Sequence, residues 1–312
     1  VKASKLDYYS LSKCLAELVF AESGLKKWVS IRQSGMLYPR LLTKANNPIT
    51  FHVPFDGVLE WTTVEDSGRV LANVCEEWVP ESFWRNFYNL SSGPQYRLTN
   101  YQFESLLLKT ISCPPVERVF ERNWFATRNF HGMWYLDADR LEEMLHFREN
   151  LDVESYFQRM KGGIPWYFSL ARIAPAFAIK AFMKYIASSD ELGTLYWLKH
   201  DIKERVEAHF GSRQEWSKIG DWSDFETAPP SGEPIVLDHG YDEEKPLGQL
   251  DSADFQHAAR FRGGECLSDD IARGAIFTPL RWRCACGNEF LMTPNAVLRG
   301  GHWCPECLKK MV

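Results

Sequence analysis

Apolar residues recur with helical spacing over much of the chain, and strand-like apolar runs are short. Leu11, Leu15, Leu18 and Val19 follow the first helical pattern, and Gly24 suits the end of that helix. Short buried strands are predicted at 28–31, 58–60 and 87–90, and further helices at 65–77, 101–110 (with Thr99 as N-cap), 137–148 and 254–261. The pattern therefore predicts a mixed α/β chain.

Helices are expected to dominate after about residue 100. Residues 151–188 are predicted to be helical with a break at 162–165, and 189–210 to form one amphipathic helix. Residues 223–252 are rich in Pro, Gly and acids, which is typical of a linker or surface arm. The most apolar stretch, 166–188, is interrupted by Arg172, Lys180 and Lys184, so we expect a buried helix pair kinked near Pro175, with a membrane-surface helix as the alternative. No transmembrane helix is expected.

Composition narrows the class of protein. The 312 residues leave room for two domains, and 45% hydrophobic residues is ordinary for a globular chain. The formal charge of −5 argues against wholesale nucleic-acid binding. Of eight cysteines, Cys14, Cys75 and Cys113 stand alone and are expected to be buried small apolar residues. The pattern favours a reducing, cytoplasmic setting over a disulfide framework.

Tyr9 and Lys13 lie four residues apart at the start of the first predicted helix, so both can point into one site. A nearby ammonium group favours the phenolate and lowers the pKa of a tyrosine, which suits general acid–base catalysis. A solvent-exposed helix face with the same spacing is the alternative.

The helix, the strand after it and the segment SIRQSGMLYP resemble the extended short-chain dehydrogenase/reductase family of NAD-dependent epimerases and dehydratases. The matching residues are Tyr9, Lys13, Arg32, Ser34, Gly35, Tyr38 and Pro39, with Gln33 in place of the usual proline. Two later segments, 61–76 with Asp66 and 87–107 with Tyr88, Asn89, Leu90, Gly93 and Thr99, resemble that family's next motifs in the same order.

The resemblance implies the C-terminal part of a Rossmann-type fold with a largely helical substrate domain. It implies NAD or NADP as cofactor, with Tyr9 and Lys13 catalytic, and with Lys13, Arg32, Ser34, Gly35 and Met36 on the cofactor side. The implied substrate is a nucleotide sugar or another hydroxyl or carbonyl compound, and a homodimer is common in the family. In the aromatic stretch 123–134, Arg128 and His131 are candidate substrate contacts, with a packed lid or core as the alternative.

The family's Gly-rich dinucleotide loop has no counterpart in the sequence, and its catalytic Ser/Thr would precede Val1. We therefore expect this chain to be the C-terminal part of a larger dehydrogenase-like protein. The alternative is a non-catalytic scaffold derived from that family, whose C-terminal module binds a protein or nucleic-acid partner.

Four cysteines near the end of the chain form two close pairs, Cys284-x-Cys286 and Cys304-x-x-Cys307, separated by seventeen residues. Gly287 and Pro305 suit tight turns beside the two pairs. Four thiolates with this spacing predict a structural, tetrahedral zinc site, against chance clustering or a disulfide.

The segment from Gly263 onward also resembles small zinc-ribbon or treble-clef modules, although Asn288 stands where those modules carry a histidine. His302 is an alternative ligand, and Cys266 is expected to be structural. Residues 255–312 carry eight Lys/Arg and five Asp/Glu, a net +3 that allows contact with an acidic partner. The predicted domains are a partial Rossmann-like core (1–110), a helical substrate domain (111–222), a linker (223–262) and the zinc-binding module (263–312).

Overall fold

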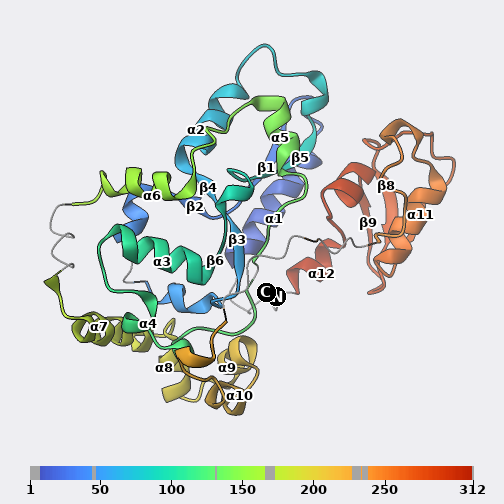
Figure 1. Ribbon diagram of the computed structural model, residues 1–312. Coiled ribbons are helices and arrows are strands. Elements are labelled where there is room, and N and C mark those ends of the chain that lie inside the picture. The colour runs from blue at the N-terminus through green and yellow to red at the C-terminus, as the bar shows by residue number, and fades with distance from the viewer. Residues whose placement is uncertain are drawn as a thin grey trace. The chain divides into compact units, whose positions relative to one another are not determined.

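A computed structural model describes residues 8–43, 47–130, 132–165, 173–226, 233 and 238–310 (Figure 1). The described chain divides into two compact units. Unit 1 contains residues 32–79 and 89–226, and unit 2 contains residues 8–31, 80–88, 233 and 238–310. Chain segments that are distant in sequence therefore meet in unit 2.

Helices and short strands alternate along the described chain. In order, the elements are α1 (Tyr8–Ala21), β1 (Val29–Gln33), β2 (Met36–Leu37), β3 (Val58–Glu60), β4 (Thr62–Thr63), α2 (Val64–Asn73), β5 (Asn86–Leu90), β6 (Arg97–Thr99), α3 (Asn100–Thr110), α4 (Val116–Val119), α5 (Ala138–Leu145), α6 (Val153–Lys161), α7 (Ala176–Ser188), α8 (Thr194–Lys199), α9 (Lys203–Phe210), α10 (Arg213–Ser217), α11 (Ser252–Phe261), β7 (Glu265–Cys266), β8 (Leu280–Arg283), β9 (Glu289–Met292) and α12 (Pro305–Lys309). A π-helical turn, Asn295–Arg299, precedes α12. The chain is thus a mixture of helix and strand, as its pattern predicts.

The strands of the described chain form small sheets. The chain crosses from one unit to the other within β1 and again within β5, and these two strands pair. In unit 1, β2 runs parallel to β4 with Met36 opposite Thr62, and β3 runs antiparallel to β6 with Val58 opposite Thr99. Sheets of two and three strands do not display a Rossmann arrangement among the described residues, so that expectation stays a prediction.

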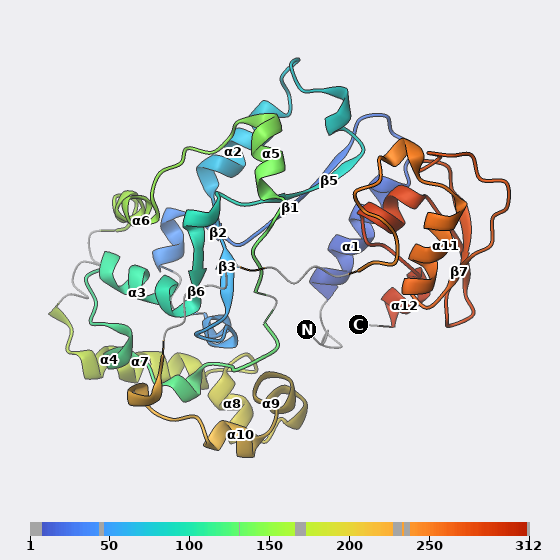
Figure 2. The same cartoon turned by 45° about the vertical axis from the view of Figure 1, so that its right-hand side comes forward.

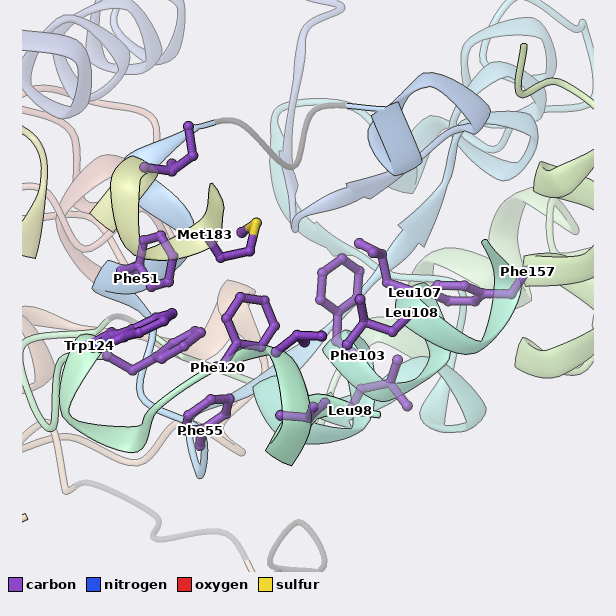
Figure 3. Close-up of a cluster of buried hydrophobic side chains, with 14 of the residues drawn as sticks. Phe51, Phe55, Leu98, Phe103, Leu107, Leu108, Phe120, Trp124, Phe157 and Met183 are labelled. Atoms are coloured by element: carbon purple, nitrogen blue, oxygen red, sulfur yellow. The ribbon is translucent and has the colours of Figure 1, made fainter. Parts of the chain in front are cut away.

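The core of unit 1 is rich in aromatic side chains. Phe51 makes edge-to-face contacts with Phe120, Trp124 and Phe125 at ring-centroid distances of 6.0, 6.3 and 4.9 Å. Such tilted pairs add to the stabilisation that comes from burial alone. Figure 3 shows this cluster, with Phe103 among its members.

Helix α3 begins as its sequence predicts. The hydroxyl of Thr99 accepts a hydrogen bond from the Gln102 backbone N–H, and the Gln102 side chain accepts one from the Thr99 N–H. This capping box satisfies two backbone donors that a helix start otherwise leaves unpaired. The predicted N-cap is therefore confirmed.

Two predicted helices end earlier than their patterns indicate, and a third is divided in two. Helix α2 ends at Asn73, and α5 ends at Leu145 because His146 adopts a left-handed backbone (φ 47°). Arg148 therefore lies outside α5, and the predicted extent of that helix to residue 148 is wrong. The predicted helix over 189–210 is two helices, α8 and α9, because Asp201 has a positive φ of 51° between them. Pro175 caps the start of α7, and residues 166–172 lie outside the described residues.

Unit 2 combines α1 with the C-terminal elements (Figure 2). Its three-stranded antiparallel sheet has the order β7-β8-β9. A hydrophobic core around Trp28, Phe87, Phe255, Trp282 and Met292 joins residues from both ends of the described chain. Trp28 packs edge-to-face on Phe87 with ring centroids 5.3 Å apart.

Burial of the isolated cysteines differs from expectation. Cys14 and Cys75 are exposed and Cys113 is half-buried, so their prediction as buried apolar residues is wrong for the first two. Cys14 lies on the solvent side of α1, and Cys75 follows the end of α2. Cys266 is buried in β7, as expected of a structural residue. In the part of the chain that the structure describes, none of the helices is sufficiently long and apolar to span a bilayer.

Candidate metal centre

The first cysteine pair lies in the turn between β8 and β9. Inward and outward side chains alternate along β8, with Trp282 fully buried between two exposed arginines. In the turn, the Cys284 backbone N–H donates to the carbonyl of Asn288, and the Gly287 N–H donates to the carbonyl of Cys284. Gly287 has a φ of 84°, a left-handed conformation that favours glycine. The turn directs both thiols to one side of the hairpin end.

The second pair lies at the start of α12. Cys304 caps this helix, Pro305 occupies its first turn, and the Leu308 N–H donates to the Cys304 carbonyl. Proline suits this position because its fixed φ is helical and the first helical N–H has no intrahelical partner. One helical turn therefore brings Cys307 beside Cys304.

The four sulfur atoms form one compact group. All four Sγ atoms lie within 4.8 Å of one another. Cys284 Sγ is 3.8 Å from Cys307 Sγ, and Cys286 Sγ is 3.6 Å from Cys304 Sγ. A tetrahedral ion with metal–sulfur bonds of about 2.3 Å would separate its sulfurs by about 3.8 Å. The cysteines are therefore spaced to hold a metal ion, and the predicted grouping is confirmed.

The electrostatics of the group also suit a cation. Burial alone would raise the pKa of Cys304, but the Cys307 backbone N–H, the Cys286 thiol and the Asn288 amide lower that pKa to about 7. Hydrogen bonds with the thiols of Cys286, Cys284 and Cys304 raise the pKa of Cys307 to about 12. Because thiolates repel one another at this separation, full deprotonation requires a bound cation.

Asn288 supports the group from outside it. Its side-chain Nδ2 lies 3.6 Å from Cys304 Sγ, within the range of a hydrogen bond to sulfur. Such a donor stabilises thiolate charge and orients the ligand. The sequence alone did not indicate that Asn288 contacts a thiol of the other cysteine pair.

The Gly-Gly element before β7 makes room for an aromatic side chain of the module. A Cβ at Gly264 would lie 2.2 Å from the Arg283 carbonyl oxygen and 2.7 Å from Trp303 Cζ2. Trp303 in turn packs edge-to-face on Trp282 and Phe290, at 5.6 and 5.2 Å. The side chain next to Cys304 is thereby held against the sheet.

Two glutamates of α1 bind the C-terminal module within unit 2. Glu17 Oε1 lies 2.8 Å from His302 Nε2, and its other carboxylate oxygen accepts from the Ser30 hydroxyl. The Glu22 carboxylate accepts from the backbone N–H of Thr293 at 3.2 Å and from its hydroxyl at 2.6 Å. His302 therefore binds α1 and is not a member of the sulfur group.

The residues implied by the dehydrogenase resemblance belong to different units. Tyr9 and Lys13 lie on α1 in unit 2, where Lys13 is exposed, and the side chain of Tyr9 is outside the described residues. Residues 32–36 belong to unit 1. There the Ser34 hydroxyl lies 2.9 Å from Thr62 Oγ1.

Gly35 has a packing role in unit 1. A Cβ at this position would approach Leu59 Cδ2 to 2.6 Å and Trp61 Cζ3 to 2.9 Å, and its carbonyl accepts from the Thr62 N–H. Met36 pairs with Thr62 between β2 and β4. Arg32 is exposed in β1. The loop residues of the predicted cofactor site thus have structural contacts of their own.

Arg128 packs at the end of α9. A Cβ at Gly211 would lie 2.6 Å from the side-chain Cζ of Arg128. The backbone N–H of Arg128 donates to the His209 carbonyl. A guanidinium at a helix C-terminus complements the negative end of the helix dipole. Arg128 is exposed, so its predicted contact with substrate stays a prediction, and His131 lies outside the described residues.

Comparison with protein-family models, with curated proteins and with solved structures finds no match to this chain.

Proposed function

We propose that Cys284, Cys286, Cys304 and Cys307 bind one zinc ion. The observation that carries this proposal is the grouping of their four sulfurs within 4.8 Å of one another, on a hairpin turn and a helix start. Thiolates are soft ligands that favour zinc or iron in a tetrahedral sulfur set, and zinc needs no redox partner.

The zinc has a structural role in this proposal. Four protein thiolates complete a tetrahedron, so no position remains for water or substrate. The ion would join the β8–β9 turn to the start of α12, and metal binding energy would contribute directly to folding of the module. The short length of α12 supports this reasoning, because five residues are too few for a helix that is stable alone.

In this proposal, the zinc-binding module holds helix α1 in place. Glu17 and Glu22 of α1 bind His302 and Thr293, which flank the π-helical turn leading to the second cysteine pair. We therefore favour a non-catalytic, zinc-stabilised scaffold as the function of this chain. In such a scaffold, helix α1, which resembles the dehydrogenase helix, would pack against the zinc-binding module and stabilise it.

The charges of the module favour a protein partner over nucleic acid. Arg283 pairs with Glu265 at 2.6 Å and with Glu289 at 2.9 Å, and Arg281 pairs with Glu289 at 3.0 Å. Arginines that are already paired attract phosphate weakly. The net +3 of this region is therefore not displayed as a basic stripe along β8.

Hydrogen exchange with and without zinc tests the scaffold proposal. Removing the metal with a chelator should remove protection from the amides of α1 as well as those of α12, because Glu17 would lose its partner. Cys307→Ser should reproduce this loss, and Cys75→Ser, a change at an exposed cysteine outside the module, is the matched control. Unchanged protection of α1 in the metal-free protein would refute a role for zinc in holding that helix.

An NAD(P)-dependent oxidoreductase of the short-chain family is the second candidate. Its support is that Tyr9 and Lys13 share one uninterrupted helix, one turn apart. Lys13 would lower the pKa of Tyr9, and Tyr9 would exchange the proton of a hydroxyl or carbonyl substrate. NADH or NADPH should then raise the Tm of the chain, and Tyr9→Phe should abolish any turnover. No shift at millimolar cofactor would count against this candidate.

A further inference from the structure

Two largely apolar cavities of unit 1 share part of their lining, and the shared part includes one buried carboxyl group. The first, the α3–α7 cavity, has a volume of about 360 Å³ and is lined by Leu107, Leu108, Ile111, Phe120, Ile179 and Met183, among others. The second, the Trp61 cavity, also measures about 360 Å³ and includes Leu59, Trp61, Leu98 and Phe130. Leu41, Thr50, Phe103 and Glu104 line both cavities. Each volume is typical of a small-molecule site.

Most of the wall of the α3–α7 cavity comes from these two helices and the segment between them, and Leu41 and Thr50 complete it. Phe103, Leu107 and Leu108 belong to α3, whereas Met183 belongs to α7 (Figure 3). Phe120 follows α4 and lies between these groups in the same view. The wall is therefore almost wholly hydrocarbon and aromatic carbon.

Glu104 is the exception in this wall. Its residue surface is 5% exposed, and none of the hydrogen bonds or ion pairs found among the described residues engages its carboxyl group. Burial raises the pKa of Glu104 to about 8, so the group is mainly protonated at neutral pH. A protonated carboxyl can donate one hydrogen bond and accept others, and leaving it unpaired in an apolar site is unfavourable.

We propose that these two neighbouring cavities together bind one apolar ketone or secondary alcohol, whose oxygen pairs with the carboxyl of Glu104. Because Glu104 lines both cavities, the polar group of the ligand is expected in the middle of the ligand molecule, with one apolar part of the ligand in each cavity. Thr50 also lines both cavities, and its hydroxyl is a second polar group available at this place. This inference depends on neither the zinc module nor a nicotinamide cofactor.

Binding of simple nine-carbon probes to the full chain tests the proposal. In calorimetric titrations, 5-nonanone and 5-nonanol should bind, and 1-nonanol should bind at least tenfold more weakly because its hydroxyl cannot reach Glu104 without leaving one cavity empty. Equal affinity for 1-nonanol and 5-nonanol would overturn the placement of the polar group, and absence of 5-nonanone binding at millimolar concentration would overturn the site.

Variants of the cavity distinguish the contribution of the hydrogen bond between Glu104 and the ligand from that of apolar contacts. Glu104→Gln should retain 5-nonanone binding within about threefold, because its amide N–H still donates, and Glu104→Leu should weaken it at least tenfold. Met183→Trp should fill the α3–α7 cavity and abolish binding. Glu143→Leu, at an exposed position on α5, is the matched control and should bind as the unaltered chain does.

Circular dichroism of each variant establishes that it is folded. If Glu104→Leu is folded and binds 5-nonanone as tightly as the unaltered chain does, the proposed contact is wrong. If Glu104→Leu does not fold, the Glu104→Gln and Met183→Trp variants still test the proposal. Binding of 5-nonanone to Met183→Trp with unchanged affinity would contradict the proposed site.

Discussion

Glu17 and His302 are 285 positions apart in the sequence, and their side chains meet at 2.8 Å, with 14% and 8% of the side chains exposed. The glutamate belongs to the helix that carries Tyr9 and Lys13, and the histidine stands two residues before Cys304. This contact makes α1 part of the cysteine-containing module.

Replacing Glu17 by alanine should destabilise unit 2. The change leaves His302 and Ser30 without a buried partner, which costs about 1–3 kcal/mol. Urea unfolding of the zinc-loaded protein, followed by tryptophan fluorescence, measures this loss. Glu76→Ala, at an exposed position after α2, is the control and should change stability by less than about 0.5 kcal/mol.

Gly264→Ala should disturb the module through packing alone. The new methyl would meet the Arg283 carbonyl at 2.2 Å and push on Trp303, so a loss of about 1–3 kcal/mol and weaker metal retention are expected. Competition with a chromogenic zinc chelator measures the second effect. Gly248→Ala is a matched change, since no atom lies within 4 Å of a Cβ there. Equal chelator sensitivity of the two variants would argue that Gly264 is not needed for close packing.

Arg97→Met should destabilise unit 1 severely. Arg97 donates two hydrogen bonds to Glu60 at 2.9 and 3.0 Å, and Glu60 is 1% exposed. The change leaves the buried carboxylate without its counter-ion, although the Ser91 hydroxyl and the Tyr135 N–H still donate to it. Breaking a buried ion pair in this way costs about 3–5 kcal/mol, and the double variant with Glu60→Leu should recover much of this loss. The exposed pair of Lys109 and Glu154 provides the comparison: Lys109→Met should cost under about 1 kcal/mol. Thermal unfolding of the four proteins is the measurement, and no recovery in the double variant would contradict the explanation.

His52 should make unit 1 acid-sensitive. Burial lowers the pKa of His52 to about 4, against the opposing effect of its hydrogen bond to the Leu192 carbonyl, and neighbouring His209 and Arg205 lower it further. Between pH 6.5 and about 4 the unfolded chain therefore binds a proton that the folded chain does not, so stability falls as the pH falls, by at most about 1.4 kcal/mol per pH unit. Above pH 6.5 this contribution is constant.

The stability of His52→Phe, measured from pH 7 to pH 4.5, isolates that contribution. As the pH falls, the free energy of unfolding of the unaltered chain should decrease relative to that of the variant. His200→Phe, at an exposed position after α8, is the matched histidine-to-phenylalanine control. If the stability of His52→Phe and that of the unaltered chain change with pH in parallel, His52 is not the source of the acid sensitivity.

Short-range signals predicted the parts of the structure that depend on neighbouring residues. The spacing of the cysteines, with Gly287 and Pro305 beside them, predicted one four-thiol group, and Thr99 predicted the start of α3. Each of these rests on turn or cap geometry within a few residues, which sequence specifies directly.

Long-range contacts account for most of what the sequence did not predict. Glu17 and Glu22 looked like ordinary polar positions of an amphipathic helix, and their partners lie at the other end of the chain. The division between α8 and α9 was missed because helical periodicity continues across Asp201, whose left-handed backbone the pattern does not reveal. Glu104 carried a readable signal, since it interrupts the apolar face formed by Phe103, Leu107 and Leu108.

Metal content tests the central claim most directly. Elemental analysis of the purified chain should give one zinc ion per chain. The double variant Cys286→Ser/Cys304→Ser should lose it, whereas Cys14→Ser/Cys75→Ser should retain it. A purified chain that is folded without metal, or a Cys286→Ser/Cys304→Ser variant that still carries stoichiometric zinc, would contradict the account.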